Sequence, residues 1–373
     1  DASTHLRHLE LQDVRLFVEA QLDVAPGTTT VLAGPNGSGK TTILEAVAYL
    51  GSQRSFRTTA RDAMVRSGEE RAIVRAELER ESRSLVVESE LRASGGARTL
   101  VNHRAVQGRA ALADAVPVTV FSPDDLGLVQ GPPARRRELL DAALRLVDLR
   151  AAADLDDMDR ILRQRAALLR QAAGKASPEI ESTLDVWDER LSAAGAAVSG
   201  ARRAIVEDAA PLVDAAYAGL AGAPGDGGHR GERTGRHAVA MTYLPGWEGE
   251  LAEALAASRR DDIRRGVSTA GPHRDELELS IEGRGARVRA SQGEQRSLAL
   301  ALRLGLHQLV TERRGGTPLL LLDDVFSELD PDRSRALVRH LPVGQALLTT
   351  AAALPEGVEV GAVVDVRTIG RRA

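Results

Sequence analysis

The sequence predicts an α/β fold in which both ends of the chain build one mixed domain and the middle forms an inserted, mainly helical lobe. Three observations carry this prediction. The apolar run "TPLLLLDDV" at 317–325 is typical of a buried parallel strand. Residues 71–106 alternate polar and apolar side chains between polar turns, as in an antiparallel β meander. Residues 133–220 consist almost entirely of helix formers.

The first part of the chain alternates like a sheet around one helix. Residues 5–17 and 28–34 are expected to be strands, and "TTILEAVAYLG" at 41–51 is expected to be a helix. After the meander, "VPVTVFSP" at 116–123 predicts one more strand, closed by a proline. The N-terminal part therefore supplies a meander and the start of an α/β unit.

The middle of the chain is expected to form two long helices. "GKASPE" at 174–179 breaks the helical pattern, and apolar side chains recur at helical spacing at Trp187, Leu191, Ala194, Val198 and Ile205. An antiparallel helical hairpin or short coiled arm over about 133–220 fits this pattern, and so does an ordinary amphipathic bundle.

Alternating and helical patterns return in the last third of the chain. We expect helices near 248–265, 293–314 and 331–341, and strands at 275–283, 345–350 and 358–366. Residues 1–123 plus 262–373 are therefore predicted to form the first lobe. Residues 124–261 are predicted to form the inserted second lobe.

Composition excludes several function classes. The 373 residues are 43% hydrophobic, enough for a sizeable core, and the net charge of −4 leaves only local arginine patches for nucleic acid. The chain has no cysteine, which excludes disulfides and cysteine–zinc sites. Aromatic residues make up 2%, which disfavours base stacking on single strands. No apolar run reaches the ~20 residues of a membrane span, so we expect a cytoplasmic protein without a membrane partner.

The segment "AGPNGSGKTT" at 33–42 fits the phosphate-binding pattern G-x-x-x-x-G-K-[ST]. Its glycines let backbone N–H groups face phosphate oxygens at a helix N-terminus. Lys40, one of only two lysines in the chain, would hold the β and γ phosphates as a compact charge. The residues expected to bind ATP here are Gly34, Pro35, Asn36, Gly37, Ser38, Gly39, Lys40, Thr41 and Thr42.

The end of the "LLLLDD" strand supplies a second anchor for Mg²⁺. Asp323 and the Thr41 hydroxyl are the expected metal ligands, with Asp124 or Asp125 as further candidates. Asp324 stands where a carboxylate can deprotonate the attacking water, although it could simply cap the strand end. Because aspartate is one methylene shorter than a glutamate at this position would be, it reaches less far towards the water, and we expect slow ATP hydrolysis.

The segment "ASQGEQRSLALALRLG" at 290–305 precedes that strand and resembles the ABC signature motif. A serine hydroxyl, a glycine N–H and a helix N-terminus can form an anion site, although a plain helix N-cap is the alternative. The expected nucleotide contacts of this segment are Ser291, Gln292, Gly293 and Glu294. "SELD" resembles the D-loop that crosses an ABC dimer interface, and it comprises Ser327, Glu328, Leu329 and Asp330.

Together these segments resemble the RecF family of ABC/SMC-like head ATPases. "RSFR" at 54–57, "FSPDDLGLVQGPPARRRELLD" at 121–141 and "GPHRDELEL" at 271–279 add to the match. The resemblance implies an SMC-head-like P-loop ATPase that uses ATP and Mg²⁺, with Lys40, Ser291 and Asp324 as catalytic residues. It also implies an ATP-dependent homodimer on duplex or gapped DNA that acts with RecR and RecO to assist RecA loading.

Several positions depart from the ABC pattern. Ala290 and Gln292 replace Leu and Gly of the usual signature, and no histidine follows the strand at 345–350, where Thr349 or Thr350 is the remaining switch candidate. Gln53 is a distant candidate for the Q-loop glutamine. These departures predict weak hydrolysis and leave ATP-driven dimerisation intact.

Arginine clusters are candidate contacts to DNA phosphates, although any single cluster is more often a solvated face. The motif "GPHRDE", which contains His273, Arg274 and Asp275, is either an interface element or a turn with all its polar groups satisfied. The DNA-contact candidates are Arg54, Arg57, Arg61, Arg135, Arg136 and Arg137, followed by Arg259, Arg260, Arg264 and Arg265.

Four other functions are alternatives. The ATP-binding subunit of an ABC transporter would carry a switch histidine and a clear Q-loop glutamine, and another SMC-like head would share the same motifs. A monomeric P-loop kinase or GTPase would have no use for residues 290–297 or "SELD". A structural SMC-like hinge protein would need hundreds of coiled-coil residues.

Overall fold

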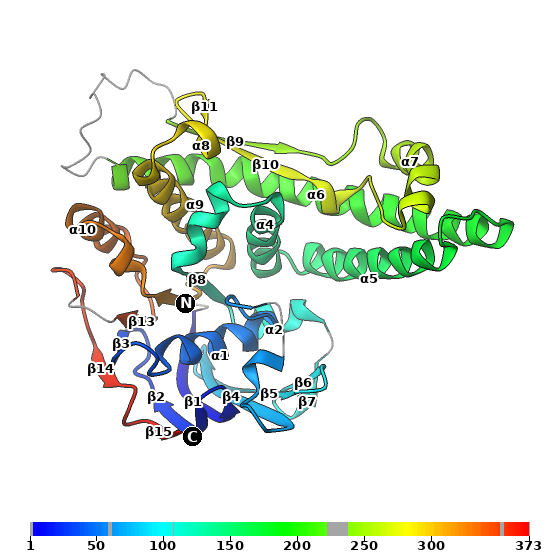
Figure 1. Ribbon diagram of the computed structural model, residues 1–373. Helices are drawn as coiled ribbons and strands as arrows, with labels where there is room; N and C mark the ends of the chain where they lie inside the picture. The colour runs from blue at the N-terminus through cyan, green and yellow to red at the C-terminus, as the bar shows by residue number, and fades with distance from the viewer. Residues whose placement is uncertain (1–2, 59–61, 107, 222–237, 351–353, 373) are drawn as a thin grey trace. The chain divides into compact units, whose positions relative to one another are not determined.

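The computed structural model describes residues 3–58, 62–106, 108–221, 238–350 and 354–372 (Figure 1). The chain forms two compact units. Unit 1 takes in the chain up to Leu126, the segment from Leu212 to Ala221, and the chain from Arg296 onward. Unit 2 comprises Gly127–Pro211 and residues 238–295. The expected division assigned 262–295 to the first lobe, whereas these residues pack within unit 2.

Unit 1 contains a seven-stranded antiparallel sheet in the order β15-β2-β1-β4-β5-β6-β7. The segment expected to form one strand at 5–17 instead turns at Arg15 and Leu16. Asp13 and Arg15 adopt left-handed backbone conformations there, with φ 52° and 50°. The turn contains no glycine or proline, the residues that usually signal a turn in a sequence. The strands are β1 (Thr4–Val14), β2 (Phe17–Asp23), β4 (Arg71–Arg80), β5 (Arg83–Arg92), β6 (Ala97–Val101), β7 (Arg104–Ala105) and β15 (Gly370–Arg372).

The second sheet of unit 1 is parallel, in the order β14-β3-β13-β12-β8. Its central strands are wholly apolar up to their carboxyl ends, as expected for a sheet covered on both faces. Because all five strands run the same way, the residues that follow them gather at one edge. The strands are β3 (Thr29–Ala33), β8 (Val118–Phe121), β12 (Leu319–Asp323), β13 (Ala346–Thr350) and β14 (Ala362–Asp365).

Helix α1 (Lys40–Ser52) carries the core of unit 1. Eleven of its thirteen residues are buried, and its apolar side chains join one cluster with residues of both sheets. Gly51 lies against the backbone of Val116, and a Cβ at that position would come within 2.3 Å of the Val116 carbonyl oxygen. The other helical elements of unit 1 are η1 (Asp62–Met64), α2 (Arg109–Ala115), η2 (Pro123–Leu126), η4 (Val325–Glu328) and α10 (Pro331–His340).

Unit 2 is mainly helical and includes a small antiparallel sheet in the order β11-β10-β9. Helix α5 ends at Ala172 and α6 begins at Pro178, so "GKASPE" lies at the predicted break between them. Leu191, Val198 and Ile205 form the buried stripe of α6.

The elements of unit 2 are α3 (Gly127–Gln130), α4 (Pro133–Val147), α5 (Leu149–Ala172), α6 (Pro178–Ala221), β9 (Val239–Leu244), α7 (Leu251–Arg265), η3 (Pro272–Arg274), β10 (Glu276–Ile281), β11 (Arg284–Gly285) and α8 (Ala286–Arg289). Two long helices cross the boundary between the units along the chain, since α6 continues into unit 1 and α9 (Gln292–Arg314) begins in unit 2.

Candidate nucleotide-binding site

The phosphate-loop motif connects the carboxyl end of β3 to the N-terminus of α1. The ammonium of Lys40 donates to the carbonyl oxygens of Gly34 at 2.6 Å and Pro35 at 3.0 Å, so the side chain folds back over its own loop. Gly39 caps α1 with φ 94°, and a Cβ there would meet the Phe17 ring at 2.6 Å. Only glycine fits this close approach of the loop to the β1–β2 hairpin.

The loop itself carries the marks of a phosphate site. Ser38 is buried and its hydroxyl has no hydrogen-bond partner among the described residues, which is costly unless something else binds there. At Gly34 a Cβ would lie 2.7 Å from that hydroxyl, so a larger residue would fill the cradle. An anion with several acceptor oxygens would satisfy Ser38 and draw Lys40 off the carbonyls, and the residues therefore fit a nucleoside triphosphate.

Asp323 ends β12 and meets the first residues of α1. Its Oδ1 accepts hydrogen bonds from the hydroxyls of Thr41 and Thr349, each at 2.8 Å. Burial raises the pKa of the Asp323 carboxyl, while the two hydroxyls and the charge of Arg57 act in the opposite direction. The predicted Mg²⁺ ligands Thr41 and Asp323 thus come together from positions far apart in the sequence.

Asp324 follows at once in a left-handed backbone conformation, with φ 47°. A non-glycine residue in that region costs free energy and is held by its surroundings. Here the hydroxyl of Thr349 accepts a hydrogen bond from the Asp324 N–H at 2.9 Å, and the Ser327 hydroxyl donates to its carbonyl oxygen at 2.8 Å. Thr349 therefore positions both acidic residues, a bridging role that motif spacing could not reveal.

A buried ion pair anchors helix α1, which begins at the end of the phosphate loop. Glu45, on α1, is fully buried and receives two hydrogen bonds from the Arg15 guanidinium, both at 2.7 Å. The Ser55 hydroxyl also donates to Glu45 and in turn accepts from the backbone N–H groups of Arg57 and Thr58 at 3.0 Å. Glu45 thus ties the β1–β2 turn and the segment after α1 to the helix. Sequence reasoning missed this residue, whose only signal was a charge inside an apolar helical pattern.

The further metal and Q-loop candidates have other partners. Asp125 is buried, accepts from the Arg303 guanidinium at 2.7 Å and caps the Ser122 N–H at 2.9 Å. Its charge is already compensated, so we withdraw it as a metal ligand. Asp124 is exposed beside it. Gln53 donates to the Thr99 hydroxyl on β6 at 3.1 Å, so its side chain is engaged with the antiparallel sheet.

The signature segment begins α9 with a reciprocal capping box. The Ser291 hydroxyl accepts from the Glu294 N–H at 3.3 Å, and the Glu294 carboxylate accepts from the Ser291 N–H at 2.7 Å. Ser291 and Gln292 are exposed, and Gly293 is half-buried. In this single chain the segment serves as a helix N-cap, and its outer surface is open to a further contact. These residues belong to unit 2, whereas Lys40 of the phosphate loop and Asp323 at the end of β12 belong to unit 1.

The predicted D-loop follows Asp324 directly. Ser327 is exposed, Leu329 is half-buried, and Glu328 lies at the end of η4. Asp330 caps α10 by accepting from the Arg333 N–H at 2.9 Å, and its second oxygen pairs with the Arg333 guanidinium at 2.6 Å. These backbone contacts and the Arg333 charge hold the pKa of Asp330 below its usual value.

The arginines predicted to contact DNA do not share one environment. Arg136 is buried and forms a bidentate pair with Glu276 at 2.8 Å, so its assignment to DNA is wrong and its role is structural. Arg137 donates to the Asp275 carbonyl oxygen at 2.6 Å, and burial lowers its pKa. Arg54, Arg57 and Arg135 are exposed, and Arg61 lies outside the described residues.

The "GPHRDE" motif forms a buried hydrogen-bond network in unit 2. Asp275 is fully buried and accepts from Ser199 and Arg202 at 3.0 Å, from the Gly246 N–H at 2.7 Å, and from the Tyr243 hydroxyl. Burial and the nearby carboxylate raise the pKa of Tyr243. Of the two interpretations of this motif, the satisfied turn is correct for Asp275.

The two residues before Asp275 in this motif share one backbone carbonyl group as a hydrogen-bond partner. His273 and Arg274 both lie 3.0 Å from the Ser268 carbonyl oxygen, and burial lowers the pKa of His273. Both side chains therefore contribute to closing the turn.

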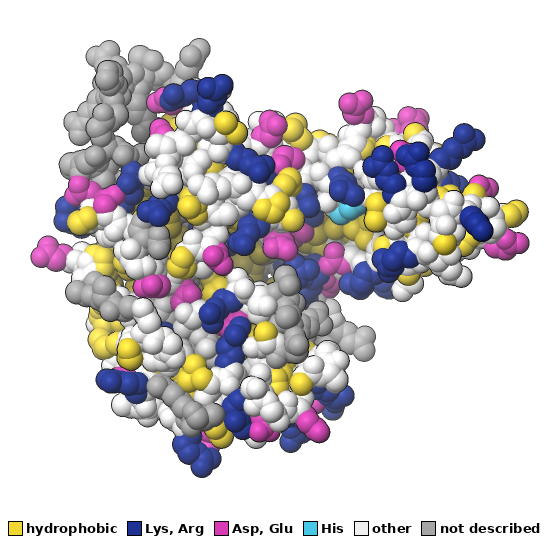
Figure 2. Space-filling view, viewed as in Figure 1, with side chains coloured by type: hydrophobic (Ala, Val, Ile, Leu, Met, Phe, Trp, Pro, Cys, Tyr) yellow, Lys and Arg dark blue, Asp and Glu magenta, His cyan; other side chains and the backbone are white. Residues whose placement is uncertain are grey.

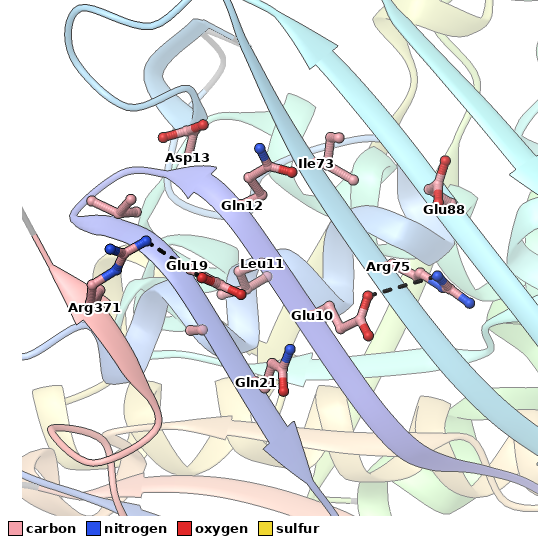
Figure 3. A pocket seen from close by; sticks show the side chains of 12 residues that line it. Glu10, Leu11, Gln12, Asp13, Glu19, Gln21, Ile73, Arg75, Glu88 and Arg371 are labelled. Carbon is pink, nitrogen blue, oxygen red and sulfur yellow. Dashed lines mark ion pairs between the residues drawn. The ribbon is translucent and has the colours of Figure 1, made fainter.

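Two charged surfaces lie outside the nucleotide site. Figure 2 shows Lys and Arg side chains gathered over α7, where Arg264 and Arg265 share Asp261, and Arg259 pairs with Asp185 and Asp188. A hollow of about 490 Å³ lies on the outward face of the seven-stranded sheet, and Figure 3 shows the side chains that line it. Its lining combines Arg75 and Arg371 with carboxylates at Glu10, Asp13, Glu19 and Glu88, which makes it a poor site for phosphates. Within the described residues, no helix has the length and apolarity needed to cross a membrane.

Comparison with known proteins shows which family the chain resembles. The family model described as the RecF/RecN/SMC N terminal domain matches residues 5–347. The chain is 40% identical over 371 residues to the DNA replication and repair protein RecF of Kineococcus radiotolerans, which covers 95% of this chain and 94% of that protein. It is 38% identical over 363 residues to the RecF of Streptomyces avermitilis, with 93% of each covered.

Solved structures agree with the sequence relatives. The structure described as the recombination mediator protein RecF-ATP in the RecFOR pathway superposes with a TM-score of 0.84 at 25% identity, over 100% of this chain and 98% of that one. An Smc head bound to the C-winged helix domain of ScpA shares the fold at 15% identity, with a TM-score of 0.51 over 93% and 90% of the two chains. The predicted SMC-head-like P-loop fold is thereby confirmed, and the chain belongs to the RecF family of DNA replication and repair proteins.

Proposed function

We propose that the chain binds ATP with Mg²⁺ in unit 1 and uses it to form a homodimer on DNA. The observation that carries the proposal is the meeting of Lys40, Thr41, Asp323 and Asp324 at the carboxyl edge of the parallel sheet. In this proposal Ser291 and the N-terminus of α9 face the nucleotide held by a second copy. Each ATP then lies between two copies, and binding energy is realised only when both are present.

Each residue has a defined role. Lys40 exchanges its loop carbonyls for phosphate oxygens, and the buried Ser38 hydroxyl gains an acceptor. Thr41 and Asp323 hold the metal, which when bound neutralises charge on the phosphate oxygens. Asp324 orients and deprotonates water, and Thr349 keeps Asp323 and Asp324 in register. Slow hydrolysis follows from the short Asp324 side chain.

The similar proteins indicate the cellular process in which this activity would take part. Proteins named for DNA replication and repair, and a RecF-ATP structure described within the RecFOR pathway, support binding of duplex or gapped DNA and action with RecR and RecO on RecA loading. The exposed Arg54, Arg57 and Arg135 are the remaining candidates for phosphate contacts. The alternatives are an ABC transporter subunit and another SMC-like head, and neither accounts for 40% identity to a RecF protein over 95% of the chain.

Sedimentation velocity tests the proposal. The wild type should move from monomer to dimer with ATP and short duplex DNA, and Lys40→Ala should stay monomeric because it cannot hold the phosphates. Ser291→Arg should bind ATP yet remain monomeric, since a bulky charge would block the second copy. If ATP leaves the wild type unchanged, or Ser291→Arg dimerises as well as the wild type, the shared-site proposal fails. Asp324→Asn should bind ATP and lose most hydrolysis.

A further inference from the structure

The one-turn helix α8, directly before the signature segment, presents an exposed apolar and basic surface. Val288 is 82% exposed, and it lies directly between two exposed arginines. Arg287 and Arg289 flank it and are also exposed, whereas Ala286 is fully buried and anchors the turn. Within the described chain neither arginine forms an ion pair or a side-chain hydrogen bond, so both charges are available to a partner.

This surface is held rigidly against the signature segment. Gln295 is buried, and its amide donates to the carbonyl oxygens of Ala286 at 3.0 Å and Arg287 at 3.1 Å. The same side chain accepts from Gln130 at 2.6 Å, which ties α8 and the start of α9 to α3. These hydrogen bonds fix α8 next to Ser291 in the free chain, which lowers the cost of ordering the two segments on binding.

The capping box places a carboxylate at the start of the signature segment. The Glu294 side chain lies at the α9 N-terminus, the place where an incoming phosphate would have to approach. The Ser291 hydroxyl alone cannot offset that negative charge. Arg296 follows Glu294 by two residues within α9, and the cations nearest Ser291 along the chain are Arg289 and Arg287, two and four residues before it.

We propose that Arg287, Val288 and Arg289 bind the face of a second copy that carries its phosphate loop, and add positive charge beside Ser291 and Glu294. The inference rests on the proposed function, because it extends the shared site by three residues. The opposing face is acidic, since it carries Asp323 and Asp324 and would hold a triphosphate. Guanidinium groups match phosphate and carboxylate oxygens in charge and geometry.

Val288 distinguishes this partner from DNA. A phosphate backbone offers charge to the two arginines and no apolar surface for a valine between them. A protein interface combines arginine with buried apolar side chains at its centre. The exposed valine between two arginines without acidic partners therefore favours a second copy of this chain.

The test compares Arg287→Gln, Arg289→Gln, the double variant and Val288→Ser with Arg284→Gln. Arg284 is a matched control because it is exposed on β11, directly before α8, and already pairs with Glu282 at 3.0 Å. All are measured with a non-hydrolysable ATP analogue, so that hydrolysis is stalled while Asp324 stays in place. Sedimentation velocity with this analogue gives the dimer dissociation constant, a fluorescent ATP analogue at low protein concentration reports binding to the monomer, and duplex DNA binding is titrated against salt.

Each single arginine substitution is expected to weaken the dimer about tenfold and the double variant about a hundredfold, as charge-assisted contacts do. Val288→Ser should weaken it a few-fold, while Arg284→Gln and nucleotide binding to the monomer stay unchanged. A double variant that dimerises like the control overturns the inference, as does one that loses only DNA affinity or only monomer nucleotide binding. A wild type that does not dimerise with ATP refutes the proposed function itself. Thermal melting confirms that each variant is folded.

Discussion

Thr349→Val tests whether one hydroxyl holds the acidic pair in place. The substitution keeps the shape of the side chain and removes two contacts, the bond to Asp323 Oδ1 at 2.8 Å and the bond from the Asp324 N–H at 2.9 Å. A hydrogen bond to a carboxylate contributes about 1.5–3 kcal/mol and a neutral one about 1 kcal/mol. Since the added methyl group recovers part of this, we expect the free energy of unfolding to fall by about 2–4 kcal/mol.

Thr30→Val is the matched control. Thr30 lies on the neighbouring strand β3, is 1% exposed, and its hydroxyl has no hydrogen-bond partner among the described residues. Replacing an unsatisfied hydroxyl by a methyl group should change stability by less than about 1 kcal/mol, towards higher stability. Urea unfolding of both variants without nucleotide measures the difference.

The same substitution should separate binding from hydrolysis. With one fewer donor, the pKa of Asp323 rises further above its usual value, and Asp324 loses the contact that fixes its backbone. ATP binding through Lys40 should persist while hydrolysis falls by about tenfold or more. If Thr349→Val costs no more stability than Thr30→Val and hydrolyses ATP at the wild-type rate, the bridging role is refuted.

Three further predictions concern buried ionisable groups. His307 is 1% exposed, neither of its ring nitrogens is hydrogen-bonded within the described chain, and burial lowers its pKa to about 4. The free energy of unfolding should therefore fall by about 3 kcal/mol as the pH drops from 6.5 to 4. Urea unfolding of His307→Leu across that range should show a smaller loss. Burial raises the pKa of Asp323 above 3.8, so its ionised form destabilises the nucleotide-free protein. Asp323→Asn should therefore have a higher melting temperature than the wild type at pH 7. Thermal melting at several pH values would contradict the raised pKa if this difference did not shrink as the pH falls towards 3.8. Asp275→Ala leaves the buried Arg202 without one of its carboxylates and should lower the free energy of unfolding by about 3–5 kcal/mol while ATP binding by the folded fraction is unchanged.

Local patterns predicted the elements that lie on one stretch of chain. The phosphate loop, the buried Asp323 strand and the break between α5 and α6 each depend on neighbouring residues, so their spacing indicated them. The turn at Arg15 and Leu16 escaped prediction because left-handed Asp13 and Arg15 are stabilised by contacts rather than by glycine.

Contacts between distant segments decided the remaining roles. Arg136 had the same local signal as the exposed Arg135, and only the approach of Glu276 shows that it is structural. Thr349 could be named as a candidate from its position after a strand, but its bridge between Asp323 and Asp324 depends on the parallel register of β12 and β13. Charge and hydropathy along one segment carry no information about such partners.

The most direct test of the central claim mixes two inactive variants. Lys40→Ala retains Ser291 but cannot hold phosphates, and Ser291→Arg retains the phosphate loop but blocks the opposite face. If each ATP site is built from two copies, a mixed dimer contains one intact site, and the mixture should hydrolyse ATP at a measurable fraction of the wild-type rate on duplex DNA. A mixture as inactive as the separate variants would contradict a site shared between two copies.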